Sequence, residues 1–146
     1  MRLLVPLLVL TVGCSPAARL KIRSQRDTRT LATAASDYWL AVRWGDVGTA
    51  AAFLESPEER LRLGRLASEP KVRVTDAQVV QVVIGDELPE AREPETREGV
   101  AVVRVEGYDV VSGRVDIVTL EQHWVLVGHD WRVDAERSPL GADRPW

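Results

Sequence analysis

The sequence is poor in the residues that build covalent and metal-bound sites. Its 146 residues include one cysteine and two histidines. A single cysteine excludes a disulfide within the chain, and a zinc site needs three or four ligands, which neither His123 nor His129 has at suitable spacing. A glycine-rich phosphate loop, a nucleophile elbow and a Cys/His pair are all absent. We therefore expect no metal, no cofactor and no catalytic residue of a recognisable type.

An excess of basic charge is also missing. The chain has 19 Lys and Arg against 22 Asp and Glu, a formal net charge of -3. Nucleic acid is not an expected partner, because phosphate binding requires a basic face. A hydrophobic fraction of 45% with 28% charged residues is typical of one globular domain with a real core.

The longest apolar run, Leu3–Val12, is too short to cross a bilayer. Ten residues of helix rise about 15 Å, half of a hydrocarbon core of about 30 Å. The run follows Met1-Arg2 and precedes Gly13-Cys14, the order of parts in an export signal. We therefore expect residues 1–13 to be a signal peptide that is removed, which leaves a chain with a formal net charge of -4.

The end of this leader, Thr11-Val12-Gly13-Cys14, resembles the lipobox of bacterial lipoproteins, with Thr11 in place of the usual Leu. The resemblance implies acylation of Cys14 and a membrane anchor made of palmitate-type chains. The alternative is an ordinary secretory leader that ends near a buried cysteine. Ser15, in place of Asp, resembles the outer-membrane sorting pattern. It implies a place in the bacterial cell envelope, facing the periplasm if the host has two membranes. Residues 14–27, polar and basic, are expected to form a lipidated tether.

Three helices are expected in the first half of the chain. Apolar residues recur at helical spacing from about Thr28 to Trp44. Asp46 is placed to cap a short helix over residues 47–54. A third helix is predicted at Ser56-Pro57-Glu58-Glu59, which offers an N-cap, a proline at the first helical position and a capping-box glutamate.

The second half changes to valine-rich alternation, which predicts strands. One long strand is expected between Val72 and Ile84, and two more over residues 100–111 and 114–127. A short fourth is expected over residues 131–134. An exposed acidic loop is predicted over residues 85–99, a domain end near residue 136, and an irregular tail over residues 137–146. The fold class is therefore α+β: N-terminal helices packed on a curved, mostly antiparallel four-stranded sheet.

The order of these elements resembles the nuclear transport factor 2-like superfamily, also called the ketosteroid-isomerase-like or cystatin-like cone fold. The resemblance rests on the stretch from Asp37 to Asp46 (DYWLAVRWGD), an Ala-rich helix, Ser-Pro-Glu-Glu, and a closing Trp131-Arg132-Val133 unit. It covers residues 28–136 and implies a curved sheet around a cavity. Members of that superfamily include enzymes, small-molecule binders and interaction modules, so the fold does not choose among them.

The residues expected around such a cavity are mostly aromatic. They are Tyr38, Trp39, Val42, Trp124 and Trp131 as its wall, and Asp116 and His123 as its polar groups. A general base on this fold would be Asp116, Glu121 or His123, with Tyr38 as oxyanion donor. Each also has a plainly structural interpretation; Asp116, for instance, can face water beside Arg114.

We favour a non-enzymatic, lipid-anchored envelope lipoprotein whose single domain is a binding or interaction module. Its expected partners are the membrane, through lipid on Cys14, and either another envelope protein or a small apolar ligand. A homodimer formed through the sheet face is a further expectation. The alternative is a small acid/base enzyme of the isomerase or dehydratase type on the same fold.

Overall fold

Seven elements follow one another along the chain. The computed structural model describes residues 16–85 and 97–138, with side chains from residue 23 onward. Cys14, the acidic segment 86–96 and most of the predicted tail, including Trp146, therefore lie outside the described residues. The elements are α1 (Pro16–Trp44), α2 (Val47–Ala51), α3 (Pro57–Ser68), β1 (Val72–Ile84), β2 (Glu98–Asp109), β3 (Val115–Val127) and β4 (Asp130–Val133).

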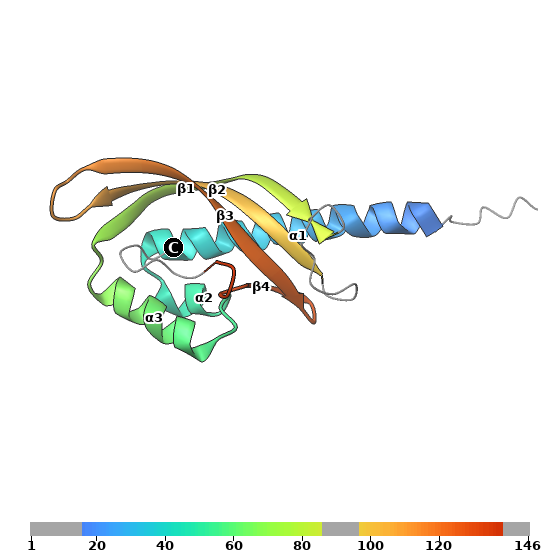
Figure 1. Ribbon diagram of the computed structural model, residues 1–146, viewed down its shortest axis with the longest axis horizontal. Helices are drawn as coiled ribbons and strands as arrows, with labels where there is room; N and C mark the ends of the chain where they lie inside the picture. The colour runs from blue at the N-terminus through green and yellow to red at the C-terminus, as the bar shows by residue number, and fades with distance from the viewer. Residues whose placement is uncertain (1–15, 86–96, 139–146) are drawn as a thin grey trace, which may run out of the picture.

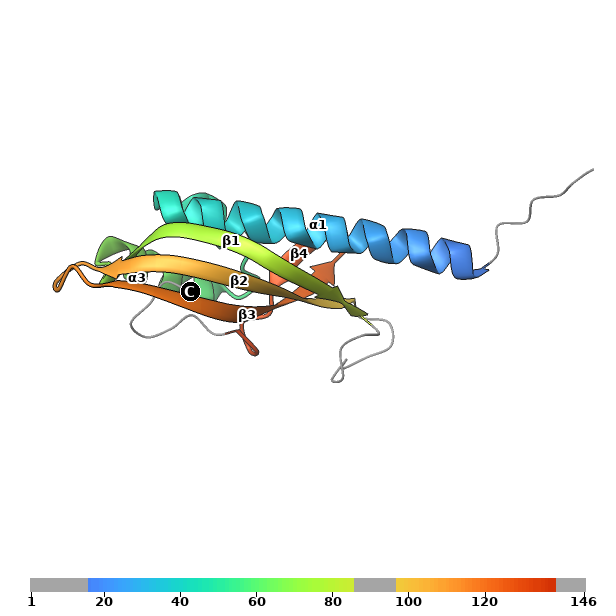
Figure 2. The same cartoon turned by 90° about the horizontal axis from the view of Figure 1, so that it is seen from above.

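The four strands form one meander in the order β1-β2-β3-β4, and each neighbouring pair is antiparallel. The sheet is curved and arches over α1, with α2 and α3 on the same side of it (Figure 1). Seen from above, α1 runs along the long strands β1, β2 and β3 (Figure 2). The predicted α+β class, with helices packed on a curved four-stranded sheet, is confirmed.

Helix α1 begins at Pro16, twelve residues before the predicted start at Thr28. Residues 16–27, expected to be a polar and basic tether before the first helix, are therefore helical. Alanine, arginine, leucine and glutamine are good helix formers, and a proline suits the first helical position. The apolar periodicity that marks a helix is missing there because this part of α1 projects past the sheet (Figures 1 and 2). Apolar periodicity marks only the part of a helix that packs on a core.

The core lies between α1 and the concave face of the sheet. In the register of β2 and β3, Gly99 pairs with Trp124 and Ala101 with Gln122, so these residues share the inner face. Leu31 and Ala35 of α1 are completely buried against it. Further members of the core are Leu54, Leu63, Val74, Ala101, Val103, Val105 and Val133.

The ends of the helices agree with the predicted signals. Gly45, at φ +70°, ends α1: its N–H donates to the carbonyl of Val42 and the next N–H to that of Ala41. Asp46 then caps α2 by accepting from the Thr49 N–H at 3.0 Å. Ser56 caps α3, although the contact from its Oγ to the N–H of Glu59 is long, at 3.4 Å.

Candidate functional site

The aromatic side chains expected to line a cavity instead fill the interior. Tyr38 is fully buried, and Trp39, Trp124 and Trp131 are 2%, 1% and 3% exposed. The Tyr38 and Trp124 rings meet edge to face with centroids 6.0 Å apart, and Phe53 packs on both. The concave face of the sheet is thus occupied by packed aromatic and valine side chains around these rings.

Two of the indoles are fixed by hydrogen bonds across the core. Trp39 Nε1 donates to Gln122 Oε1 at 3.1 Å, in a buried contact between α1 and β3. Trp131 Nε1 donates to Thr30 Oγ1 at 3.0 Å and joins β4 to α1. These two bonds join α1 to β3 and to β4.

The polar atoms of two other aromatic residues are buried without a partner. The Tyr38 hydroxyl, the indole N–H of Trp124 and one carboxylate oxygen of Glu59 have no hydrogen-bond partner among the described residues. Burial, and to a smaller extent the negative charge of Glu59, raise the pKa of Tyr38 above its ordinary value of 10.0. Tyr38 therefore stays neutral, and neither it nor Glu59 lines either of the two hollows described below.

The three candidate bases do not converge on Tyr38. His123 and Glu121 pair with Val100 and Val102, on the face of the sheet opposite to the buried Trp124. Asp116 has inner-face parity but sits near the end of the β2–β3 hairpin, where it forms an ion pair with Arg114 at 3.0 Å. The structure therefore does not bring the predicted polar cavity residues together.

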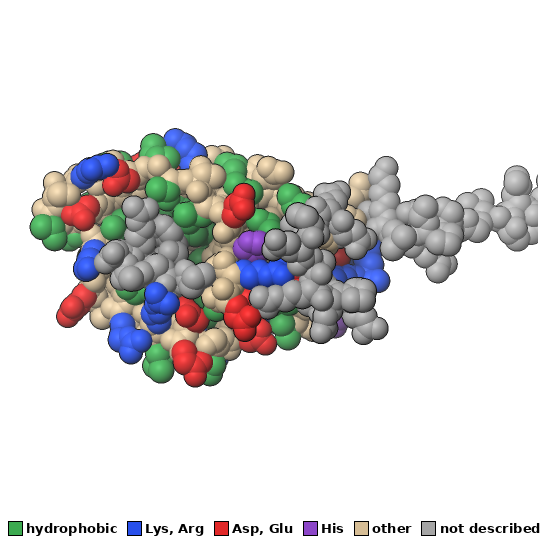
Figure 3. All heavy atoms as spheres, viewed as in Figure 1, with side chains coloured by type: hydrophobic (Ala, Val, Ile, Leu, Met, Phe, Trp, Pro, Cys, Tyr) green, Lys and Arg blue, Asp and Glu red, His purple; other side chains and the backbone are tan. Residues whose placement is uncertain are grey.

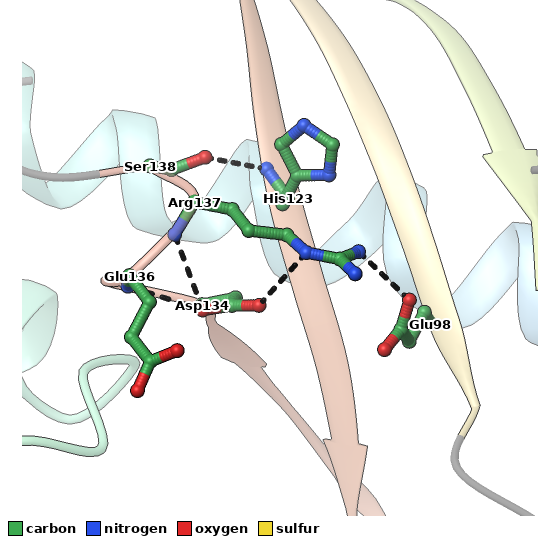
Figure 4. A network of polar contacts seen from close by, with 6 residues as sticks. All are labelled: Glu98, His123, Asp134, Glu136, Arg137 and Ser138. Carbon is green, nitrogen blue, oxygen red and sulfur yellow. Dashed lines mark hydrogen bonds and ion pairs between the residues drawn. The ribbon is translucent and has the colours of Figure 1, made fainter. Parts of the chain in front are cut away.

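His123 belongs instead to a polar network at the end of the chain (Figure 4). Its backbone N–H donates to Ser138 Oγ at 2.7 Å, while the Asp134 N–H donates to the His123 carbonyl at 2.9 Å. Arg137 reaches across β3 to Glu98 of β2 and forms an ion pair at 2.8 Å (Figure 4). The network fastens the C-terminal turn to the outer face of the sheet and serves the fold.

This network corrects two of the sequence expectations. Glu98 was placed in an exposed loop, yet it is 6% exposed and begins β2. Arg137 and Ser138 were placed in an irregular tail, yet both bind the sheet. The acidic and proline-rich composition of residues 85–99 suggested a loop. It gave no indication that Glu98 pairs with Arg137, 39 residues further along the chain.

An apolar groove of about 510 Å³ opens where α1 ends. It lies between the last turn of α1, helices α2 and α3, and the first residues of β1. The apolar side chains that line it come from all four elements and include Val42, Val47, Leu63, Leu66, Ala67, Val72 and Val74. The Gly45 turn and the Asp46 cap shape the groove, because they swing α2 and α3 away from the axis of α1.

Charged and aromatic residues also line this groove. Trp44 is 75% exposed and stacks with the Arg43 guanidinium, which lies 5.7 Å from the centre of its ring. Arg43 is also 3.5 Å from Asp76. Arg73 makes no ion pair with any of the described residues. The groove therefore offers apolar walls, one exposed indole and one unpaired cation.

A second hollow, of about 340 Å³, lies between α1 and the turn before β4. Its lining includes Asp37, His129, Asp130 and Arg132. His129 is exposed, as expected for a turn residue. Acidic and basic side chains are interspersed on the face shown in Figure 3.

Sequence reasoning found only part of the groove. Val42 was expected at a cavity wall and lines the groove, whereas Trp44 was assigned only to the helix end. Leu66, Val72 and Val74 were treated as ordinary core or strand residues. One feature of the sequence could have indicated the groove. Trp44 directly precedes the Gly45-Asp46 break, so a large apolar side chain lies where the helix ends and the chain turns.

Within the part of the chain that the structure describes, no cluster of three or more His, Cys, Asp or Glu is arranged to hold a metal ion. No described helix combines the length and apolar character needed to cross a membrane. The chain is thus an α+β domain with one open four-stranded sheet and helices on one of its faces. Scans against protein-family models and against curated proteins find no match to this chain.

Proposed function

We propose that this chain is a bacterial envelope lipoprotein, anchored through an acylated Cys14, whose domain binds a small and largely apolar ligand. The apolar groove at the end of α1 is the binding site. The resemblance of residues 28–136 to the cone-fold superfamily supports a binding role but does not choose the ligand.

The observation that carries this proposal is the contrast between the interior and the groove. The interior is filled by Tyr38, Trp39 and Trp124, whereas the groove is open, apolar and about 510 Å³ in volume. Sites for small ligands typically measure about 300–1,000 Å³ and combine apolar walls with a few polar groups. Arg73, which has no ion pair with a described residue, favours a ligand that carries one anionic group.

A binding role is favoured over the acid/base enzyme because the candidate bases point elsewhere. Asp116 is paired with Arg114, and His123 lies on the outer face of the sheet. The enzyme alternative would have to use Tyr38 and Glu59, whose hydroxyl and one carboxylate oxygen are buried without a hydrogen-bond partner among the described residues. A general base must reach the proton it removes, and these two groups are outside the groove.

The groove is tested with 8-anilinonaphthalene-1-sulfonate, a fluorescent probe with apolar rings and one sulfonate. We expect the folded protein to bind it and Ala67→Trp, which fills the groove, to weaken binding on the order of tenfold. Leu61→Trp is the matched control, because Leu61 lies on the same helix, is 68% exposed and does not line the groove. Equal binding by both variants would remove the groove from the proposal. Circular dichroism must show that both are folded.

The anchor is tested separately by metabolic labelling with palmitate in a bacterial host. We expect label on the wild-type chain and none on Cys14→Ala. Label on the variant would refute the assignment of Cys14. Two or three acyl chains give a durable anchor, whereas one gives only reversible attachment.

A further inference from the structure

The N-terminal turns of α1 project from the domain as a helical stalk. Backbone of α1 is continuous from Pro16, two residues after Cys14, and its first buried side chain among those described is Asp27. Figures 1 and 2 both show this end of α1 beyond the sheet. A helix rises 1.5 Å per residue, so Pro16 and Trp44 lie about 42 Å apart along its axis.

Charge is segregated between this stalk and the rest of the chain. Residues 15–30 contain five basic side chains, Arg19, Lys21, Arg23, Arg26 and Arg29, and one acid, Asp27. That acid is held in an ion pair with Arg97 at 2.7 Å. Residues 31–146 contain 13 basic and 21 acidic side chains, so a basic end is joined to an acidic body.

The arginines of the stalk are available to a partner. Arg23, Arg26 and Arg29 follow one another at intervals of three residues, are all exposed, and form no ion pair with the described residues. Residues three apart on a helix are neighbours on its surface. They therefore form one continuous basic strip.

We infer that this basic strip is a membrane-contact surface that seats on anionic phospholipid headgroups. The inference rests on the proposed anchor, because an acyl chain on Cys14 places the start of α1 at the bilayer. Each Lys or Arg near an anionic surface contributes enough to strengthen attachment severalfold. The acidic body is repelled by the same surface, so we expect α1 to be tilted, with the basic strip against the headgroups and the groove beside Trp44 held away from the bilayer.

The test uses unacylated protein, so its outcome does not depend on whether Cys14 is modified. The chain from residue 14 with Cys14→Ser contains every described element, the first of which begins at Pro16. Its sedimentation is measured with sucrose-loaded vesicles of phosphatidylcholine alone or mixed equally with phosphatidylglycerol, at low ionic strength. We expect at least about tenfold stronger binding to the anionic vesicles, lost in about 0.5 M salt where charges are screened.

Two triple variants distinguish an effect of the basic strip from an effect of the overall net charge. Arg23→Gln, Arg26→Gln and Arg29→Gln together should weaken anionic-vesicle binding by about tenfold or more. The control, Arg65→Gln, Arg104→Gln and Arg114→Gln, changes net charge equally at exposed positions outside α1. Equal losses of vesicle binding in the two triple variants would overturn the inference. So would equal binding of the wild type to neutral and to anionic vesicles. Near-UV circular dichroism of the tryptophans confirms that each variant is folded.

Discussion

Leu31 of α1 packs directly onto the backbone of Gly99 in β2. A Cβ atom at residue 99 would collide with Leu31 Cδ2 and lie only 3.0 Å from Ile84 Cδ1 and 3.2 Å from the carbonyl oxygen of Val83. Leu31 is fully buried, so it has little freedom to move away. This contact sets how closely α1 approaches the sheet.

We therefore expect Gly99→Ala to destabilise the domain by about 1–3 kcal/mol, because overpacking a tight contact displaces its neighbours. Gly64→Ala is the matched control. Gly64 lies within α3 with open space around its Cα, and alanine there should stabilise by about 0.5–1 kcal/mol. Urea unfolding measures both, and a Gly99→Ala variant as stable as the wild type would contradict the packing described.

Tyr38 should ionise only when the protein unfolds. Burial raises the pKa of Tyr38 above its ordinary value of 10.0. Since the folded-state pKa is raised, the contribution of Tyr38 to stability is complete below the unfolded pKa of about 10 and falls as pH rises above it. The difference in absorbance near 295 nm between the wild type and Tyr38→Phe should therefore develop only as the wild type unfolds.

Tyr38→Phe is the control for that titration. It removes the absorbance change that Tyr38 contributes and should not lower stability at neutral pH, because the hydroxyl has no hydrogen-bond partner among the described residues. A clear loss of stability in Tyr38→Phe would show that the hydroxyl is bonded after all.

The ion pair between Arg137 and Glu98 should contribute more to the stability of the domain than ion pairs at the surface do. The side chains are 16% and 7% exposed, so Arg137→Met leaves a buried carboxylate unpaired and should cost about 3 kcal/mol. Adding Glu98→Gln to Arg137→Met should recover part of that loss. Arg114→Met, at a pair with 77% and 44% exposure, should cost less than about 1 kcal/mol. Similar costs for the two arginine variants would refute a structural role for the C-terminal turn.

Lowering the pH should remove the stabilising contributions of two carboxylates: Asp46, which caps α2, and Asp109, which accepts hydrogen bonds in the turn after β2. Hydrogen bonds from Thr49 lower the pKa of Asp46, and those from Ser112 lower the pKa of Asp109, both below an ordinary 3.8. Because the folded-state values are lowered, their contribution is present above pH 3.8 and is lost as pH falls through them. Asp46→Asn with Asp109→Asn should therefore flatten the loss of stability below about pH 4. An unchanged acid profile would contradict these bonds.

The sequence predicted the elements well because most of them bury a face. The alternation of residues in the strands and the capping residues Asp46 and Ser56 are local signals, because each depends on residues that are close together in the sequence. Residues 16–27 of α1 have no apolar pattern at helical spacing, so this part of the helix was missed. Glu98 and Arg137 were misplaced because their pairing joins distant parts of the chain.

The groove was harder to predict than the core. Alternation along the strand shows that Trp124 and His123 face opposite sides of the sheet. It does not show whether the side chains on either face leave a cavity. Here Tyr38, Trp39 and Trp124 fill the concave face, and the open site moves to the end of α1. That outcome depends on side-chain volumes across three elements, which only packing reveals.

The most direct test of the account is the mass of the N-terminal peptide of the protein extracted from bacterial membranes. A lipid-anchored binding module requires a peptide that starts at Cys14 and carries a diacylglyceryl group. A peptide that retains residues 1–13, or one that starts at residue 14 with an unmodified thiol, would contradict the central claim.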